Sequence, residues 1–165
     1  MLSPRRKTRL EVQGMLGYSR ADLDELKYGI RFAYVFCGFL VLMGVISQNL
    51  YLLGAMNIIA FGGVILKNHP FDYLYNYGLR HLLKKPPIPH RPPQIRFACV
   101  IATFWLLATH LLFMYEWTVS ASIMGYLLVS IAALVGFTDI CIPSIIYNVL
   151  YQKKIKTEDP LAQKF

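Results

Sequence analysis

The stretch IRFAYVFCGFLVLMGVIS, residues 30–47, carries one charged residue, Arg31, followed by an uninterrupted apolar run. A closely similar phrase, IRFACV at residues 95–100, opens a second apolar block after Arg96. A helix needs roughly 20 apolar residues to cross the hydrocarbon core of a bilayer, with about 17 as the lower end. The repeated phrase therefore predicts two similar membrane hairpins, each entering the bilayer at an arginine.

The composition favours the same class of protein. Of 165 residues, 56% are hydrophobic and only 16% are charged, and the mean hydropathy is +0.44. A soluble domain is usually less apolar, so we expect a single all-α integral membrane domain. The amino-terminal MLSPRRKTRLEVQGM has no apolar stretch directly after its positive charges, and we therefore expect no cleavable secretory signal.

Four apolar blocks cover residues 30–47, 51–66, 96–115 and 119–147. The first two are separated by QNL and the last two by EWT, and such short connections are typical of tight turns between antiparallel helices. The second block is the shortest and would span the bilayer only with flanking residues. The shared IRFA phrase is explained equally well by an ancient duplication and by chance in a biased composition.

These features predict five segments. They are a cytoplasmic amino-terminal segment with a short helix (1–29), a first transmembrane hairpin (30–66), a cytoplasmic amphipathic helix with a proline-rich linker (67–95), a second hairpin (96–147) and a cytoplasmic tail (148–165). The orientation follows from the 17 Lys and Arg residues, because all lie in the two terminal segments, the middle segment or the helix entrances, and none lies in the two turns. Basic residues of short loops stay on the cytoplasmic side. We read the net charge of +8 as a topology signal and expect no nucleic-acid partner.

The middle segment contains a helical apolar stripe within FDYLYNYGLRHLLKK, residues 71–85. Its members recur at helical spacing: Phe71, Leu74, Tyr75, Leu79, Leu82 and Leu83. Polar residues, Asp72 among them, occupy the other side. We expect an amphipathic helix lying flat at the cytoplasmic membrane interface, followed by the extended linker PPIPHRPPQ. A further helix is predicted in SRADLDELKYG, where Ser19 and Asp22 have the spacing of a capping box.

Asp139 is the acidic residue least expected in its setting, because a carboxylate at membrane depth is costly. Counting residues from the outer turn places it near the cytoplasmic boundary, level with Arg31 and Arg96. A structural ion pair with one of these arginines is the prediction, and a proton-transfer role is the alternative. His110 lies in the outer half of the third block, and without a second membrane histidine we predict no haem or other cofactor there. A hydrogen-bonded contact between helices is expected for His110 and for Asn57.

The three cysteines, Cys37, Cys99 and Cys141, lie in separate apolar blocks without a Cys-x-x-Cys pair. This spacing predicts small packing residues and no metal site. The sequence also contains no GxGxxG, phosphate-binding loop, HExxH or GxSxG motif, so an enzyme is the less favoured class.

Three stretches, NHPFDYLYNYGLRHLL, RPPQIRFA and GFTDICIPSIIYNVL, give the chain a family likeness. Over about residues 25 to 151 it resembles the bacterial membrane family catalogued as domain of unknown function 4395. The resemblance implies paired hairpins in a bacterial cytoplasmic (inner) membrane and no particular reaction. The ending of that family has a Phe, a Cys, two residues, a second Cys and a nearby Tyr. Phe137, Cys141 and Tyr147 match, but Ser144 stands in place of the second cysteine, so that disulfide cannot form.

Three functional hypotheses follow. The leading one is a non-catalytic accessory or scaffold subunit that contacts the lipid bilayer and packs against other membrane protein subunits of a larger complex. The second is a thiol-based or sulfur-handling membrane protein that uses Cys141. The third is a small-solute transporter that uses Asp139 and His110.

Overall fold

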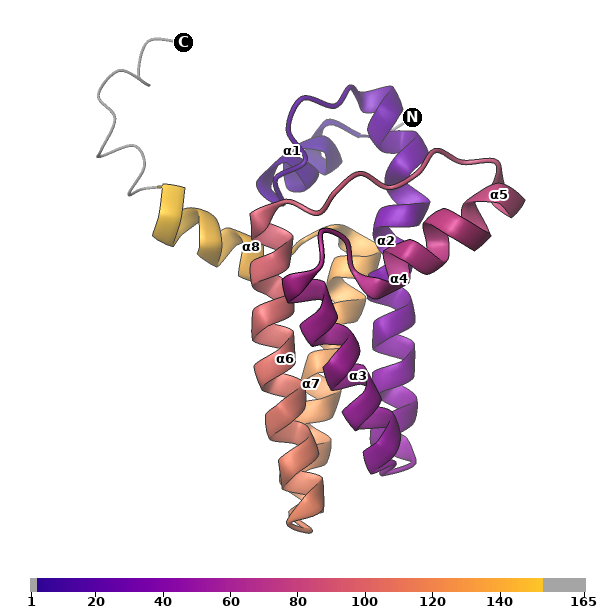
Figure 1. The fold of residues 1–165 in the computed structure, drawn as a ribbon. Coiled ribbons are helices and arrows are strands. Elements are labelled where there is room, and N and C mark those ends of the chain that lie inside the picture. Colours follow the sequence, from indigo (N-terminus) through magenta and orange to yellow (C-terminus); the bar gives the residue numbers. More distant parts are fainter. Residues whose placement is uncertain (1–2, 153–165) are drawn as a thin grey trace.

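The computed structural model describes residues 3–152, and all of its regular structure is helical. Four long helices form a bundle, while shorter helices gather at one end of it (Figure 1). In chain order the elements are α1 (Pro4–Val12), α2 (Arg20–Ile46), α3 (Leu50–Ile65), α4 (Pro70–Leu74), the π-helical segment η1 (Tyr75–Leu79), α5 (Arg80–Leu83), α6 (Pro93–Met114), α7 (Thr118–Thr138), α8 (Ile142–Tyr147) and the π-helical segment η2 (Asn148–Gln152).

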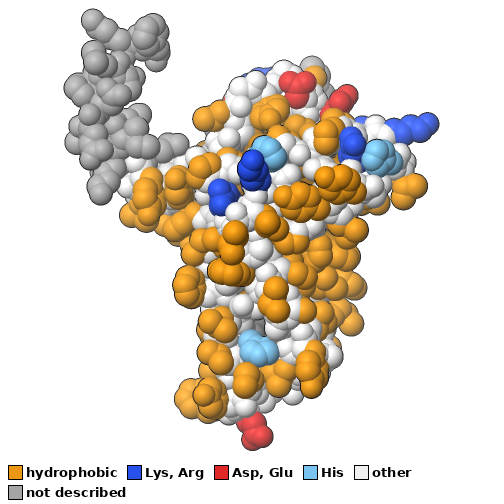
Figure 2. Space-filling view, in the orientation of Figure 1, with side chains coloured by type: hydrophobic (Ala, Val, Ile, Leu, Met, Phe, Trp, Pro, Cys, Tyr) orange, Lys and Arg blue, Asp and Glu red, His pale blue; other side chains and the backbone are white. Residues whose placement is uncertain are grey.

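Three helices, α2, α6 and α7, are long and apolar enough to cross a membrane. The fourth, α3, has 16 residues and is about 24 Å long at 1.5 Å per residue, less than the roughly 30 Å of the hydrocarbon core. It continues into α4–α5 through an 85° bend, so residues 3–152 contain three candidate membrane spans, or four if the bent pair counts as one span. Apolar side chains cover the narrow stem of the molecule, and basic ones gather at its wide end (Figure 2). These features indicate an all-α integral membrane protein, as predicted.

The two tight turns at the narrow end have the same construction. Gln48 and Glu116 adopt left-handed backbone conformations, with φ of 50° and 62°. The next residue then donates its backbone N–H to a carbonyl five residues back, Asn49 to Gly44 and Trp117 to Leu112, each at 2.9 Å. This is the Schellman pattern, which satisfies carbonyls at a helix end. QNL and EWT therefore reverse the chain within three residues, as their length suggested.

The bundle is held together mainly across the two hairpins. The most extensive contacts join α2 to α7 and α3 to α6. Close approach of α2 and α7 depends on a glycine, because a Cβ added at Gly125 would lie 2.4 Å from Val45 Cγ2. At the other end of the same contact, a Cβ at Gly136 would lie 2.9 Å from Val35 Cγ2. Only glycine allows backbones this near to a β-branched side chain, and both sites set the distance between the helices.

The first long helix, α2, begins earlier than the predicted start of the apolar block at residue 30. SRADLDELKYG is not a separate helix but the first turns of α2, which starts at Arg20 and runs without a break through the apolar block. The predicted capping box is confirmed: Asp22 N donates to Ser19 Oγ at 3.2 Å, and Ser19 N donates to Asp22 Oδ2 at 2.9 Å.

The fourth apolar block, residues 119–147, does not form one continuous helix. Asp139 has φ of 58°, a left-handed conformation that ends α7 at Thr138, and α8 begins only at Ile142. The last carbonyls of α7 are taken by arginines from other helices, and Pro143, which has no N–H, suits the first turn of a new helix.

The middle segment also departs from the predicted flat amphipathic helix. It is interrupted by the π-helical segment η1, which shifts the angular positions of the residues that follow. Phe71 and Tyr75 pack inside the protein, whereas Leu82 is 82% exposed. Leu74 and Leu83 are also exposed, and Leu79 is partly buried. Asp72, expected on the polar outer side, is fully buried.

The cytoplasmic tail predicted for 148–165 lies for the most part, from residue 153 onward, outside the described residues.

Candidate functional site

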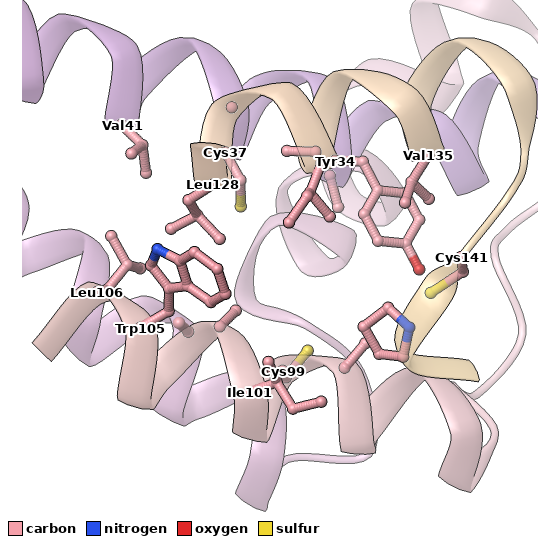
Figure 3. Close-up of a pocket in the computed structure, with 18 of the residues that line it drawn as sticks. Tyr34, Cys37, Val41, Cys99, Ile101, Trp105, Leu106, Leu128, Val135 and Cys141 are labelled. Carbon is pink, nitrogen blue, oxygen red and sulfur yellow. The ribbon is translucent and has the colours of Figure 1, made fainter. Parts of the chain in front are cut away.

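A cavity of about 260 Å³ lies between α2, α6, α7 and the start of α8. Most of the side chains around it are apolar, including Val41, Leu106 and Leu128 toward the narrow end of the bundle (Figure 3). The polar or reactive side chains that line it are few: Tyr34, Cys37, His69, Arg91, Cys99 and Cys141.

All three cysteines line this one cavity. Cys37 comes from α2, Cys99 from α6 and Cys141 from the connection between α7 and α8, and each is a free thiol (Figure 3). Their positions in the sequence suggested three unrelated packing residues. Cross-hairpin packing instead brings them around a common space.

His69 lies beside two of these thiols. Its Nδ1 accepts a hydrogen bond from the backbone N–H of Phe71 at 3.3 Å, so in the neutral ring the proton lies on Nε2. That Nε2 is 3.9 Å from Cys37 Sγ, a weak N–H···S contact. A Cβ at Gly63 would lie 2.6 Å from His69 Cδ2 and 3.0 Å from Cys99 Sγ. The glycine thus makes room for the imidazole and the second thiol at the same point on α3.

A buried ion pair connects two parts of the middle segment, and one of its members, Arg91, lines the cavity. Arg91 donates from Nε to Asp72 Oδ2 at 2.6 Å and from Nη2 to Asp72 Oδ1 at 2.5 Å, and neither side chain is more than 5% exposed. The same carboxylate accepts from the backbone N–H of His69 at 3.0 Å. A two-pronged arginine–carboxylate contact satisfies charges that would otherwise be costly to bury. The pair therefore holds His69 in place.

The charge of Arg91 also acts on its neighbours. Burial alone would lower the pKa of Arg91, but the Asp72 carboxylate outweighs burial and raises it, so the guanidinium stays charged. Burial, reinforced by this nearby positive charge, lowers the pKa of His69 to about 4. The imidazole is therefore neutral near pH 7, and its Nε2–H is available as a hydrogen-bond donor.

Tyr34 completes the polar lining. Its ring lies against the Arg91 guanidinium, 5.1 Å from centroid to Cζ. Its hydroxyl is buried without a hydrogen-bond partner among residues 3–152, and it points toward Cys141 (Figure 3). Buried hydroxyls are normally paired, so this group is available to a molecule bound in the cavity.

Sequence reasoning missed His69, Asp72, Arg91 and Tyr34 as site residues. One signal was present. Asp72 is the only acidic residue of segment 67–95, and it follows His69 at the spacing of a helix cap. Nothing local in the sequence indicated Arg91 or Tyr34.

Asp139 lies at a separate cluster. Its Oδ1 accepts from Arg31 Nε at 3.0 Å and its Oδ2 accepts from Arg31 Nη2 at 2.9 Å. Arg6 of α1, which was not anticipated, donates to the same carboxylate. Arg96 is not part of this cluster; its guanidinium donates to the carbonyls of Val64 and Ile65 at the end of α3.

The remaining candidates are placed singly. Asn57 donates to the Thr103 carbonyl at 2.8 Å and confirms the predicted contact between α3 and α6. His110 packs over Gly54, and its Nδ1 is buried without a partner among the described residues. Ser144 is fully buried, and its hydroxyl has no hydrogen-bond partner among the described residues. No group of three His, Cys, Asp or Glu side chains within 3–152 is arranged to hold a metal ion.

Replacing Asp139 by asparagine should lower the stability of the protein in detergent, because Arg31 and Arg6 lose their shared carboxylate. The combined change with Arg31→Gln should cost less than the two single changes added, by about 0.5–3 kcal/mol in the free energy of unfolding. Arg96→Gln is the matched control, since that arginine bonds only backbone carbonyls, and its effect should add to that of Asp139→Asn. Strict additivity with Arg31→Gln would contradict the ion pair.

The stability should also fall in acid through His69. Its folded pKa of about 4 lies below the usual value of 6.5, so between these pH values the unfolded chain binds more protons. The free energy of unfolding should therefore decrease by up to about 3 kcal/mol as the pH drops from 6.5 to 4. His69→Asn keeps an acceptor at the helix cap and should flatten this dependence. Equal pH profiles for the two proteins in thermal melts would rule out His69 as the cause.

Comparison with known proteins reveals one relationship. No curated protein and no solved structure matches the chain. The family model described as Domain of unknown function (DUF4395) matches residues 27–152, a range that covers most of the chain and contains every residue lining the cavity. Helix α1, its connection to α2 and the first turns of α2 precede the match. The chain therefore belongs to the family Domain of unknown function (DUF4395).

Proposed function

We propose that this protein is a thiol-based membrane protein that accepts sulfur from a small sulfur compound in the cavity between α2, α6 and α7. One observation carries the proposal: three free cysteines from separate parts of the chain line a single cavity. The sequence singled out only Cys141 for such a role. Cys37 is the better candidate for the attacking group, because its Sγ lies 3.9 Å from Nε2 of the His69 imidazole.

The chemistry needs no outside oxidant. The Cys37 thiolate attacks the outer sulfur of a persulfide, R–S–SH, and the sulfur–sulfur bond breaks. Cys37 becomes a persulfide, and the leaving thiolate takes up the proton that Cys37 released, giving R–SH. A thiolate is the reactive form of cysteine, and the His69 Nε2–H and the Arg91 charge face the cavity where that anion forms.

The setting suits a small and mostly apolar donor. The volume of about 260 Å³ lies just below the range usual for drug-sized ligands, and the lining offers few polar contacts besides the Tyr34 hydroxyl and the Arg91 guanidinium. Cys99 and Cys141 face the same space, so the same exchange can pass the sulfur on. A second cysteine attacks the outer sulfur of the Cys37 persulfide and becomes the persulfide itself, and Cys37 is released as a thiol.

The accessory-subunit and transporter hypotheses remain predictions. An exposed apolar stem suits contact with partner subunits, but it suits contact with lipid chains equally. The transporter hypothesis relied on Asp139 and His110, and neither residue lines the cavity. The geometry therefore favours the thiol hypothesis.

We also propose that the wide end of the molecule, with α1, α4, α5 and α8, faces the cytoplasm of a bacterium. The argument is the distribution of charge, because neither turn at the narrow end contains Lys or Arg. In a cysteine-free chain carrying single new cysteines, position 81 should react with membrane-impermeant reagents only after the cytoplasmic side is opened. Positions 49 and 116 should react in intact cells. Labelling of position 81 from outside would overturn the orientation.

Sulfur loading tests the function itself. The purified full chain, treated with a small alkyl persulfide such as ethyl persulfide and then desalted, should gain the mass of one sulfur atom, and Cys37→Ser should lose this gain. Ala102→Leu, which narrows the cavity but keeps all three thiols, should load roughly tenfold more slowly, as if about 1.4 kcal/mol were added to the barrier.

Ala55→Leu is the matched control for the cavity change. Ala55 is exposed on α3 and does not line the cavity, so this variant should load like the wild type. No gain of sulfur in the wild type would overturn the proposal, as would equal rates for the two leucine variants. A gain that depends on Cys141 but not on Cys37 would overturn the assignment of the attacking thiol.

A further inference from the structure

A second depression, of about 320 Å³, lies between α1, α2 and the carboxyl end of α7. It is separate from the cavity with the cysteines, and its lining residues belong to two classes. One class is basic: Arg5, Arg6 and Arg9 from α1 and Arg31 from α2. The other consists of Phe137, Thr138 and Asp139 at the end of α7, with Ser3 at the start of α1.

The charges in this depression do not balance. Four guanidinium groups face one carboxylate, leaving three positive charges in excess. Asp139 is 3% exposed and is already occupied by Arg31 and Arg6. Arg9 donates to the Thr138 carbonyl at 2.8 Å and can still offer its other N–H groups.

Two further details concern the donors that an anion could use, and the first distinguishes the site from an ordinary solvated basic surface. Arg6 Nη2 is buried and has no hydrogen-bond partner among residues 3–152. Within the same range, the Arg5 side chain makes no hydrogen bond or ion pair. A buried guanidinium nitrogen is normally satisfied, so Arg6 Nη2 is available to an oxygen of a bound anion. The Arg5 side chain is exposed beside it and can contact the same anion.

An apolar stripe leads away from the depression. Phe137, which lines it, is 72% exposed. Leu134, Leu127 and Ile123 are also exposed and follow at helical spacing along the same face of α7, down the stem. The site therefore combines a cationic end at the wide part of the molecule with an apolar track toward the membrane interior.

We infer that this depression binds the phosphate headgroup of an anionic phospholipid, with an acyl chain lying along Phe137 and the exposed face of α7. The forked guanidinium donors of Arg5, Arg6 and Arg9 match phosphate oxygens, and anionic lipids concentrate basic residues at the cytoplasmic leaflet. A free phosphate would use the arginines but would have no use for the apolar track. The inference is independent of sulfur chemistry in the other cavity.

The test measures lipid binding to the full chain in a neutral detergent. Phosphatidylglycerol and phosphatidylcholine with the same acyl chains are titrated, and bound lipid is counted by native mass spectrometry alongside the melting temperature. The wild type should bind one phosphatidylglycerol in preference to phosphatidylcholine. Arg5→Gln/Arg9→Gln should weaken that binding roughly tenfold or more. Lys84→Gln/Lys85→Gln removes the same charge from the end of α5 and should leave it unchanged.

Each other result counts against the inference. Equal weakening by the two double variants would indicate unspecific attraction between charges. Stabilisation by glycerol 3-phosphate as large as that by phosphatidylglycerol would indicate a site for soluble phosphate esters. If Arg5→Gln/Arg9→Gln melts early without lipid, Arg5→Gln alone replaces it, because Arg5 makes no contact that the fold needs; unchanged lipid preference in that variant would overturn the assignment.

Discussion

The end of a helix leaves carbonyl groups that the helix itself cannot satisfy, and two arginines meet this constraint here. Arg31 of α2 bonds the Phe137 carbonyl at the end of α7, and Arg96 of α6 bonds the carbonyls of Val64 and Ile65 at the end of α3. Each arginine belongs to one hairpin and closes a helix of the other. These bonds fix how far the paired helices slide past each other, and the rest of the structure depends on that register.

The cavity is one consequence of this register. The residues that follow each arginine in the repeated phrase occupy equivalent places, so Ala33 and Ala98 both line it, as do Tyr34 and Cys99. The repeated phrase thus places the Tyr34 hydroxyl and the Cys99 thiol on two different walls of one cavity (Figure 3). Cys141 arrives from a third direction, because α7 ends at Thr138 and the chain turns at Asp139 before α8 begins.

A second buried contact closes the wide end. The Asp72–Arg91 pair ties α4 to the proline-rich linker, and Asn76 adds two bonds to the backbone of Ile88, at 2.8 and 3.2 Å. A segment that would otherwise be free to lie along the membrane surface is therefore packed over the cavity. Through Asp72 it also orients His69, so the electrostatics of the cavity depend on a segment outside the four long helices.

Several features of the protein could be predicted from local patterns in the sequence. Apolar blocks of membrane length, two tight turns, the Ser19 cap and the polar contact of Asn57 follow from periodicity, spacing and the need to pair polar groups in lipid. Local patterns did not predict which distant side chains meet: the three cysteines, Arg91 with Asp72, and Arg6 rather than Arg96 at Asp139. Their meeting depends on packing between hairpins, on the π-helical turn at Tyr75–Leu79 and on the left-handed turn at Asp139. These depend on contacts between residues far apart in the chain, which periodicity within one segment does not encode.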